Sequence, residues 1–334
     1  MDAFDLRVRP DGVVIAYAAA GALWLQRLDR GGDLIGDPRY VSVVGGRVRA
    51  LVAGASAGRA VLAWLRVEGG EAHVEASMGN GRSLAFGPPV TLDHWSPVAS
   101  SAGALGERDL ALRVTPTGAF RLLHRAAPMP CGSGMACATF GHSDLDGSPS
   151  QRVPRPTLAA EDVCPWPLPG VVDAGGRTYY GLCTVADGQP RTTLYMLQPE
   201  PQYAQADPAL EGCEPLGVLA TGEHGDRAAP GALFAADCPS GREVVRLAEP
   251  GVSPTPLGGV LPPSCGEEHP ALHVGAMTLP LATGRDRLEG FLPSTVAPAR
   301  SRVAWTGEVF VVAALEGRTL TARSRRCDQL ATTP

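Results

Sequence analysis

The chain has 334 residues, a formal net charge of −5, 41 glycines and 31 prolines. All 29 basic residues are arginine, so a Schiff-base lysine and a phosphate-loop lysine are excluded. The acidic balance and the lack of long basic runs argue against nucleic-acid binding, and no apolar stretch reaches the roughly 20 residues of a membrane helix. Abundant Gly and Pro favour an all-β chain, because many strands need many turns.

The first part of the chain predicts repeated groups of short strands. The first group has strands at residues 6–8, 13–18, 22–28 and 39–43. The segment Val48–Met78 shows the pattern more clearly, since the apolar run Ala60–Leu65 is followed by the turn Glu68–Gly70 and then by strictly alternating residues. An apolar run joined by a tight turn to an alternating run predicts a buried strand paired with a half-exposed strand.

Hairpins of this kind recur along the whole chain. They begin near residues 13, 60, 109, 178, 232, 277 and 309. Such spacing, with four short antiparallel strands per unit, predicts a single all-β domain over residues 1–334, folded as a β-propeller. Seven blades fit best, and six or eight stay open because the fifth and sixth units are hard to delimit.

Three local features complete the predicted propeller. The fourth strand of the fourth unit is placed near Pro215–Leu219, and the one helical turn is expected at Asp207–Leu210. A Pro/Gly/Ser-rich insertion is expected at about 126–163.

The blade pattern resembles that of secreted bacterial β-propeller repeat proteins, and the resemblance covers nearly the whole chain. The sequence has no Trp-Asp blade ending, no kelch double glycine and no Ser-x-Asp-x-Gly-x-x-Trp box. The resemblance therefore implies the fold and says little about function.

The eight cysteines point to an oxidising compartment. They are Cys131, Cys137, Cys164, Cys183, Cys213, Cys238, Cys265 and Cys327. No two have Cys-x-x-Cys spacing, which argues against a zinc ribbon or a redox pair and favours structural disulfides, with free buried thiols as the alternative. Pairing could follow 105 schemes; we favour sequence neighbours, Cys131–Cys137, Cys164–Cys183, Cys213–Cys238 and Cys265–Cys327. We expect an extracellular, cell-surface or periplasmic protein whose signal peptide has been removed.

Two motifs match known catalytic patterns but lie in the wrong context. Gly54–Gly58 has Gly-x-Ser-x-Gly spacing, yet a strand follows it where a nucleophile elbow needs a helix, so a turn is predicted. His269 and His273 resemble a helical zinc pair, but Pro270 would break that helix.

Acidic residues and histidines gather in segments predicted to connect blades. The candidate ligand site consists of Asp93, His94, Trp95, Glu223, His224, Asp226, Glu267, Glu268 and His269, and the predicted insertion adds His142, Asp144 and Asp146. Connectors from an outer strand to the next inner strand cross one face of a propeller, so these groups could meet there and hold a divalent metal or form an acid/base pair. The alternative is an ordinary solvated connector. Trp95 and Trp166 are expected near the surface, where they could stack on sugars.

Two functions follow from these patterns. The first is an exported, non-enzymatic propeller that binds or scaffolds a protein or glycan partner, without nucleic acid and without a resident cofactor. The alternative is a hydrolase or lyase that uses carboxylates and histidines of the connector face. The sequence leaves the oligomeric state open.

Overall fold

The structure is a computed structural model in which nearly all described residues lie in strands or tight turns. It describes residues 1–56, 58–96, 105–106, 109–114, 119–130, 136–145, 151–153, 172–174, 177–186, 189–197, 201–211, 214–220, 232–247, 255–258, 260–265, 270–274, 277–280 and 301–326. No helix that could span a membrane occurs within these ranges.

The strands form seven antiparallel sheets in chain order, here called blades 1 to 7. Blade 1 contains β1 (Ala3–Arg9), β2 (Gly12–Ala19), β3 (Ala22–Leu28) and β4 (Leu34–Val43). Blade 2 contains β5 (Arg47–Ala55), β6 (Arg59–Glu68), β7 (Glu71–Asn80) and β8 (Val90–Trp95). Blade 3 contains β9 (Leu110–Val114), β10 (Phe120–Pro130), β11 (Ala136–Asp144) and β12 (Gln151–Val153). Blade 4 contains β13 (Val172–Ala174), β14 (Arg177–Ala186), β15 (Gln189–Leu197) and β16 (Pro201–Glu211).

The remaining blades follow the same sequential order. Blade 5 contains β17 (Glu214–Ala220), β18 (Ala232–Cys238), β19 (Gly241–Leu247) and β20 (Thr255–Gly258). Blade 6 has three described strands, β21 (Val260–Cys265), β22 (Pro270–Val274) and β23 (Met277–Pro280). Blade 7 also has three, β24 (Ser301–Trp305), β25 (Phe310–Glu316) and β26 (Thr319–Arg325).

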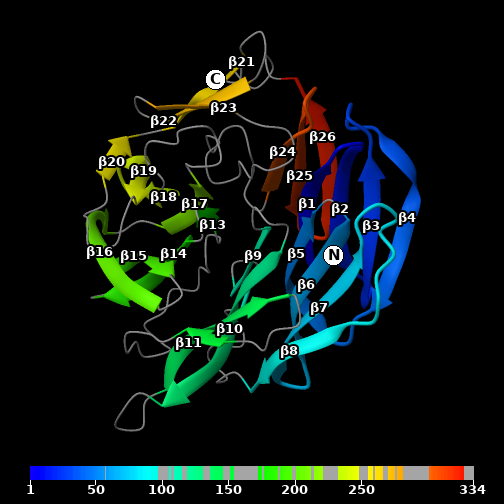
Figure 1. Cartoon of the computed structure of the whole chain (residues 1–334), viewed down its shortest axis with the longest axis horizontal. Helices are drawn as coiled ribbons and strands as arrows, with labels where there is room; N and C mark the ends of the chain where they lie inside the picture. The colour runs from blue at the N-terminus through cyan, green and yellow to red at the C-terminus, as the bar shows by residue number, and fades with distance from the viewer. Residues whose placement is uncertain are drawn as a thin grey trace.

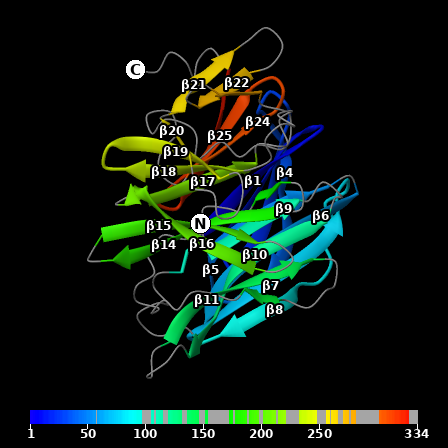
Figure 2. The same cartoon turned by 60° about the vertical axis from the view of Figure 1, so that its left-hand side comes forward.

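The sheets stand around a common centre, with β1, β5, β9, β13, β17 and β24 on the inner side of their blades (Figure 1). Strand β1 contacts β5, β5 contacts β9, β9 contacts β13, and β13 contacts β17. Strand β24 of the last blade contacts β1 of the first, which brings the two ends of the described chain together. Figure 2 shows blades 2 and 3 side by side, with β10 against β8. The predicted β-propeller with seven blades is confirmed.

Two faces of the ring follow from the pairing register. In blade 2, Arg47 at the start of β5 pairs with Val67, Glu68 pairs with Glu71, and Ala72 pairs with Trp95 at the end of β8. The start of the inner strand, the turn between the second and third strands, and the end of the outer strand therefore share one face. We call it the leading face.

Apolar clusters fill the spaces between neighbouring blades. Trp64, Leu51 and Leu62 pack with residues of blade 1, and Val61, Leu65 and Val74 pack with Leu112 and Phe120 of blade 3. A third cluster, the closure seam, joins blade 1 to blade 7. It consists of Phe4, Leu6, Val13, Ile15, Leu28, Ala304, Val311, Ala313 and Leu315. Alternating side chains of one sheet thus serve two interfaces, which explains why inner strands have apolar residues on both faces.

Two-residue turns set the register of the first two central hairpins. Ala20 and Gly21 join β2 to β3 with φ of 52° and 73°, and Gly69 and Gly70 join β6 to β7 with φ of 58° and 87°. Positive φ at both central residues is the type I′ geometry that matches the twist of paired strands. The second of these turns confirms the turn predicted at Glu68–Gly70.

A buried polar network links the second and third strands of blade 2. Trp64 Nε1 donates a 2.7 Å hydrogen bond to Glu75 Oε2, directly across the β6–β7 pair. Arg66 donates to both Glu75 oxygens, at 2.9 Å and 3.1 Å. Glu75 is 9% exposed, and these donors offset the cost of burying its charge.

Three sequence predictions are wrong in detail. Asp207–Leu210 lies in strand β16, where a helical turn was expected, and β16 is the fourth strand of blade 4. Pro215–Leu219 therefore lies in β17, the first strand of the next blade. Within the predicted insertion, residues 126–130, 136–144 and 151–153 lie in β10, β11 and β12 of blade 3. Pro and Gly in these segments resemble loop composition, although edge strands and bulges also tolerate them.

Candidate functional site

The carboxylate of Asp5 lies where the inner strands of blades 1, 2 and 7 meet. Its Oδ2 accepts a 2.7 Å hydrogen bond from the backbone N–H of Ala53 on β5. Its Oδ1 lies 3.7 Å from Arg302 Nε on β24, and the Asp5 side chain is 1% exposed. Residues far apart in the sequence thus bring a backbone donor and a guanidinium to one buried carboxylate.

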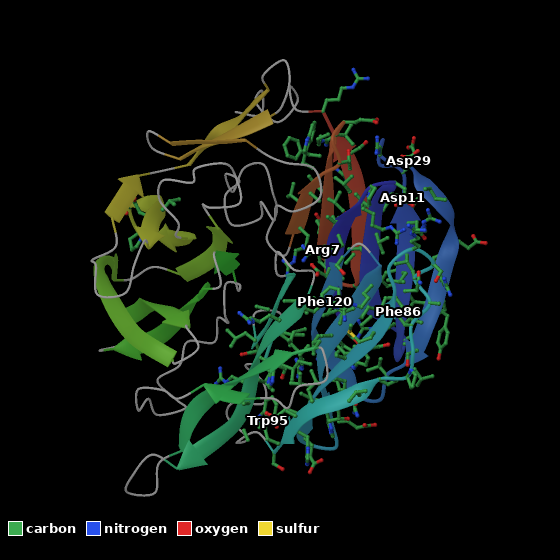
Figure 3. All side chains as sticks on the ribbon, viewed as in Figure 1. Arg7, Asp11, Asp29, Phe86, Trp95 and Phe120 are labelled. Atoms are coloured by element: carbon green, nitrogen blue, oxygen red, sulfur yellow. The ribbon has the colours of Figure 1, made fainter. Side chains whose placement is uncertain are left out.

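Arginines dominate the other described polar positions of these inner strands. Arg7 lies two residues after Asp5 on β1, and Figure 3 shows Arg7 at the inner side of blade 1. Arg47 and Arg49 lie on β5, where Arg49 is the extra residue of a bulge between Val48 and Ala50. The inner ring around Asp5 therefore carries an excess of positive charge.

The hydrogen-bonding groups of the Arg49 side chain do not all have partners among the described residues. Its Nε is buried and makes no hydrogen bond within the described ranges. Burial lowers the pKa of Arg49 below its usual value, Arg47 lowers it further, and Asp2 opposes the shift. A buried guanidinium N–H without an acceptor is costly, so this position favours an incoming anionic or acceptor group.

The part of the predicted ligand site on β8 occupies the outer strand of blade 2. Asp93 Oδ1 accepts a 2.9 Å hydrogen bond from the backbone N–H of His94. The exposed His94 ring lies against His73 of β7, with ring centroids 6.3 Å apart and planes 17° apart. Trp95 is 7% exposed and packs in the blade 2–blade 3 cluster, so it is buried where a surface position was expected. Sequence reasoning missed His73, which lies directly opposite His94 in the β7–β8 pair.

The remaining candidate ligands lie outside the described residues. Glu223, His224 and Asp226 fall between β17 and β18, and Glu267, Glu268 and His269 fall between β21 and β22. Both segments connect a first strand to a second strand, so their assignment to connectors after a fourth strand is wrong. That assignment was the reason for expecting them on one face with Asp93 and His94. Trp166 also lies outside the described residues.

Two other sequence features can be compared with the structure. Ser56 N donates to Arg59 O at 2.9 Å in the turn between β5 and β6, as expected for a turn rather than a nucleophile elbow. Cys238 is disulfide-bonded, and the four pairings stay predictions.

The carboxyl group of Asp109 is buried in blade 3. It accepts a 2.7 Å hydrogen bond from Gly106 N and lies 3.4 Å from Arg125 Nη1. Burial raises the pKa of Asp109 above its usual 3.8, and Arg125 only partly opposes that shift.

We expect Asp109 to make stability depend on pH in a defined direction. Because its folded pKa is raised, its contribution is fully present below the unfolded pKa of 3.8 and is lost as the pH rises through the folded value. Denaturant unfolding of wild type and Asp109→Asn across this range tests the assignment. The free energy of unfolding of wild type, minus that of Asp109→Asn, should decrease as the pH rises. If this difference in the free energy of unfolding did not change with pH, the raised pKa of Asp109 would be contradicted.

Comparisons with known proteins find solved structures with a similar fold and no similar sequence family. No protein-family model matches the chain, and no curated protein matches it. A functionally unknown protein from Desulfotomaculum acetoxidans has a TM-score of 0.40 and 10% identity, with 96% of this chain and 95% of that chain covered. An exo-β-1,3-galactanase from Phanerochaete chrysosporium has a TM-score of 0.39 and 10% identity over 78% of this chain.

Further solved structures include an α-L-arabinanase of Cellvibrio cellulosa, with a TM-score of 0.36 and 9% identity over 76% of this chain and 93% of that one. The chain spans 52% of a bifunctional GH43-CE protein of Bacteroides eggerthii and 64% of the galactanase. At such identities the likeness concerns the fold alone.

These matches correct one functional expectation. The similar structures that carry a named activity include a galactanase, arabinanases and an arabinofuranosidase, which are hydrolases of glycans. The expectation of a non-enzymatic binding or scaffold module is therefore withdrawn, and the hydrolase alternative is taken forward.

Proposed function

We propose that the chain is a glycan hydrolase whose reaction centre lies at the inner strands of blades 1, 2 and 7, with Asp5 as one of its carboxylates. The observation that carries the proposal is the burial of Asp5 between Ala53 N and Arg302 Nε, each contributed by a different blade. Hydrolysis of a glycosidic bond uses a pair of carboxyl groups, one of which attacks the sugar or activates water. The Ala53 N–H donor and the nearby Arg302 charge suit that role, because they orient the carboxylate and stabilise its negative charge.

The arginines of the inner strands support an anionic substrate. Arg302 on β24 lies beside Asp5, and Arg7 and Arg49 lie on the inner strands β1 and β5 of the neighbouring blades. The buried Nε of Arg49 lacks an acceptor among the described residues, and a guanidinium pairs readily with a carboxylate or an ester sulfate. We therefore propose a glycan that carries uronate or sulfate groups.

A polysaccharide panel tests this proposal. Release of reducing ends is measured for polygalacturonate, a sulfated glycan, arabinan and β-1,3-galactan, with wild type, Asp5→Asn and Arg49→Gln. Asn at position 5 keeps an oxygen acceptor for Ala53 N but removes the charge. We expect Asp5→Asn to lose at least about 100-fold in kcat, as for removal of a group that acts on the reacting atoms. Arg49→Gln should raise KM for acidic substrates and leave neutral ones unchanged.

The matched control for Asp5→Asn is Asp11→Asn. Asp11 is a carboxylate in the β1–β2 turn, paired with Arg9 and Arg27, and its side chain is 48% exposed. It should keep full activity. Hydrolysis by Asp5→Asn at the wild-type rate, or no hydrolysis of any glycan by wild type, would reject the proposal.

An extracellular, cell-surface or periplasmic location stays part of the proposal. The eight cysteines and the bonded state of Cys238 support it. Peptide mass mapping without reduction tests the four neighbour pairings.

A further inference from the structure

The histidine pair on blade 2 has the layout of a two-point metal ligand. His73 on β7 and His94 on β8 are direct cross-strand partners, and no residue of either strand intervenes. Their rings lie nearly parallel, with centroids 6.3 Å apart. Opposite residues of neighbouring strands have Cβ atoms about 5 Å apart, so both imidazoles can turn toward one ion held between them.

Solvent can reach the histidine pair on the outer strands of blade 2. His94 is exposed, and the His73 side chain is 20% exposed. The pair lies near the turn Glu68–Glu71 and the end of β8, and therefore on the leading face at the periphery of blade 2. An ion could reach it without any rearrangement of the blade.

The charges around the pair also suit a cation. Glu71 Oε2 lies 3.8 Å from His73 Nε2, and its half-exposed side chain can approach further. Arg66 is the partner of His73 on the other side, but its guanidinium is engaged by Glu75 and Glu68. Asp93 directly precedes His94 on β8 and already accepts a hydrogen bond from the His94 backbone N–H, so it is not counted as a ligand.

We infer that His73 and His94 bind a divalent transition metal, with Glu71 as the nearest further ligand. No complete group of three metal-ligating side chains is found among the described residues, so the remaining positions on the ion belong to Glu71 after a small movement and to water. Imidazole ligands suit Zn²⁺, Ni²⁺ and Cu²⁺, and Cu²⁺ should bind most tightly of the three. This site is separate from the inner strands and does not depend on the proposed hydrolase activity.

Calorimetric titration of tag-free protein with Zn²⁺ and with Cu²⁺ tests the inference. We expect wild type to bind one ion at this site and His94→Gln to lose about tenfold or more in affinity, as for removal of a chelating ligand. His73→Gln should lose a similar factor, and the double variant should lose little beyond either single variant. Glu71→Gln should show a smaller loss.

Two further readouts separate metal binding from a merely structural contact. Cu²⁺ bound to wild type should show coupling to two nitrogens in its electron paramagnetic resonance spectrum, and His94→Gln should show one. Metal should also raise the melting temperature of wild type more than that of His94→Gln, because binding to the folded state alone stabilises it. Unchanged affinity and spectrum in both single variants would place the ion elsewhere and overturn the inference. Absence of binding to wild type would reduce the pair to a cross-strand contact and overturn it as well.

Discussion

Replacing Trp64 by alanine should lower the free energy of unfolding by about 3–5 kcal/mol. The Trp64 side chain is 0% exposed and is the largest fully buried side chain in the described part of the chain. Alanine would leave a cavity in the cluster between blades 1 and 2 and would remove a donor from Glu75. Denaturant unfolding, followed by circular dichroism, measures the loss.

Trp64→Phe separates these two causes. Phenylalanine fills most of the space but cannot donate to Glu75 Oε2, so it should cost about 1–3 kcal/mol, the penalty of an unsatisfied buried group. In the Glu75→Gln background that penalty should shrink, because the acceptor is no longer charged. Equal losses for Trp64→Phe in both backgrounds would show that packing alone explains the effect.

Replacing Phe4 by alanine should cost about 3–5 kcal/mol and loosen the closure seam specifically. Phe4 is 0% exposed, packs against Val311 and Ala313, and lies under the Arg302 guanidinium, 5.7 Å from its ring centre. Among the described residues, blades 1 and 7 share no hydrogen-bonded sheet, so apolar packing holds them together with the Asp5–Arg302 ion pair and the Thr306–Arg30 hydrogen bond. Amide hydrogen exchange should therefore rise in β1 and β25 and stay near wild type in β7.

Phe120→Ala is the matched control for the seam. Phe120 is 1% exposed at the blade 2–blade 3 interface and lies under Arg59 at 5.8 Å, much as Phe4 lies under Arg302. It should lose a similar free energy of unfolding, with increased exchange in β6 and β9 and none in β25. If both variants raised exchange over the same strands, the seam would not be a separate unit.

The fold could be predicted from periodicity because each blade repeats the same local chemistry. The Glu68–Gly70 turn and the apolar run of β6 appear in the structure as predicted. Strand boundaries failed where composition was ambiguous, as in β16, whose two prolines and alternating small residues resemble a loop as much as an edge strand. Misplacing that strand then shifted β17 into the wrong blade.

The candidate site was less accessible from sequence. Asp5 stands in an apolar strand near the start of the chain, and its partners Ala53 and Arg302 come from blades 2 and 7. No spacing rule links three such positions, because their proximity arises only when the ring closes. The pairing of His73 with His94 lies within one blade, but the long connection between β7 and β8 and a register shift between Val74 and Glu75 leave it undetermined by the sequence pattern.

The sequential order of the blades also bears on how the chain folds. Each described sheet is built from one continuous stretch, so most pairings form between residues close in sequence and can be completed blade by blade during synthesis. The seam differs, since Thr306 Oγ1 donates to Arg30 O across 276 residues. Asp5, which needs Arg302 beside it, acquires its full surroundings only in that last long-range step. A chain stopped before β24 would hold the six preceding sheets, and its Asp5 carboxylate would lack the Arg302 guanidinium.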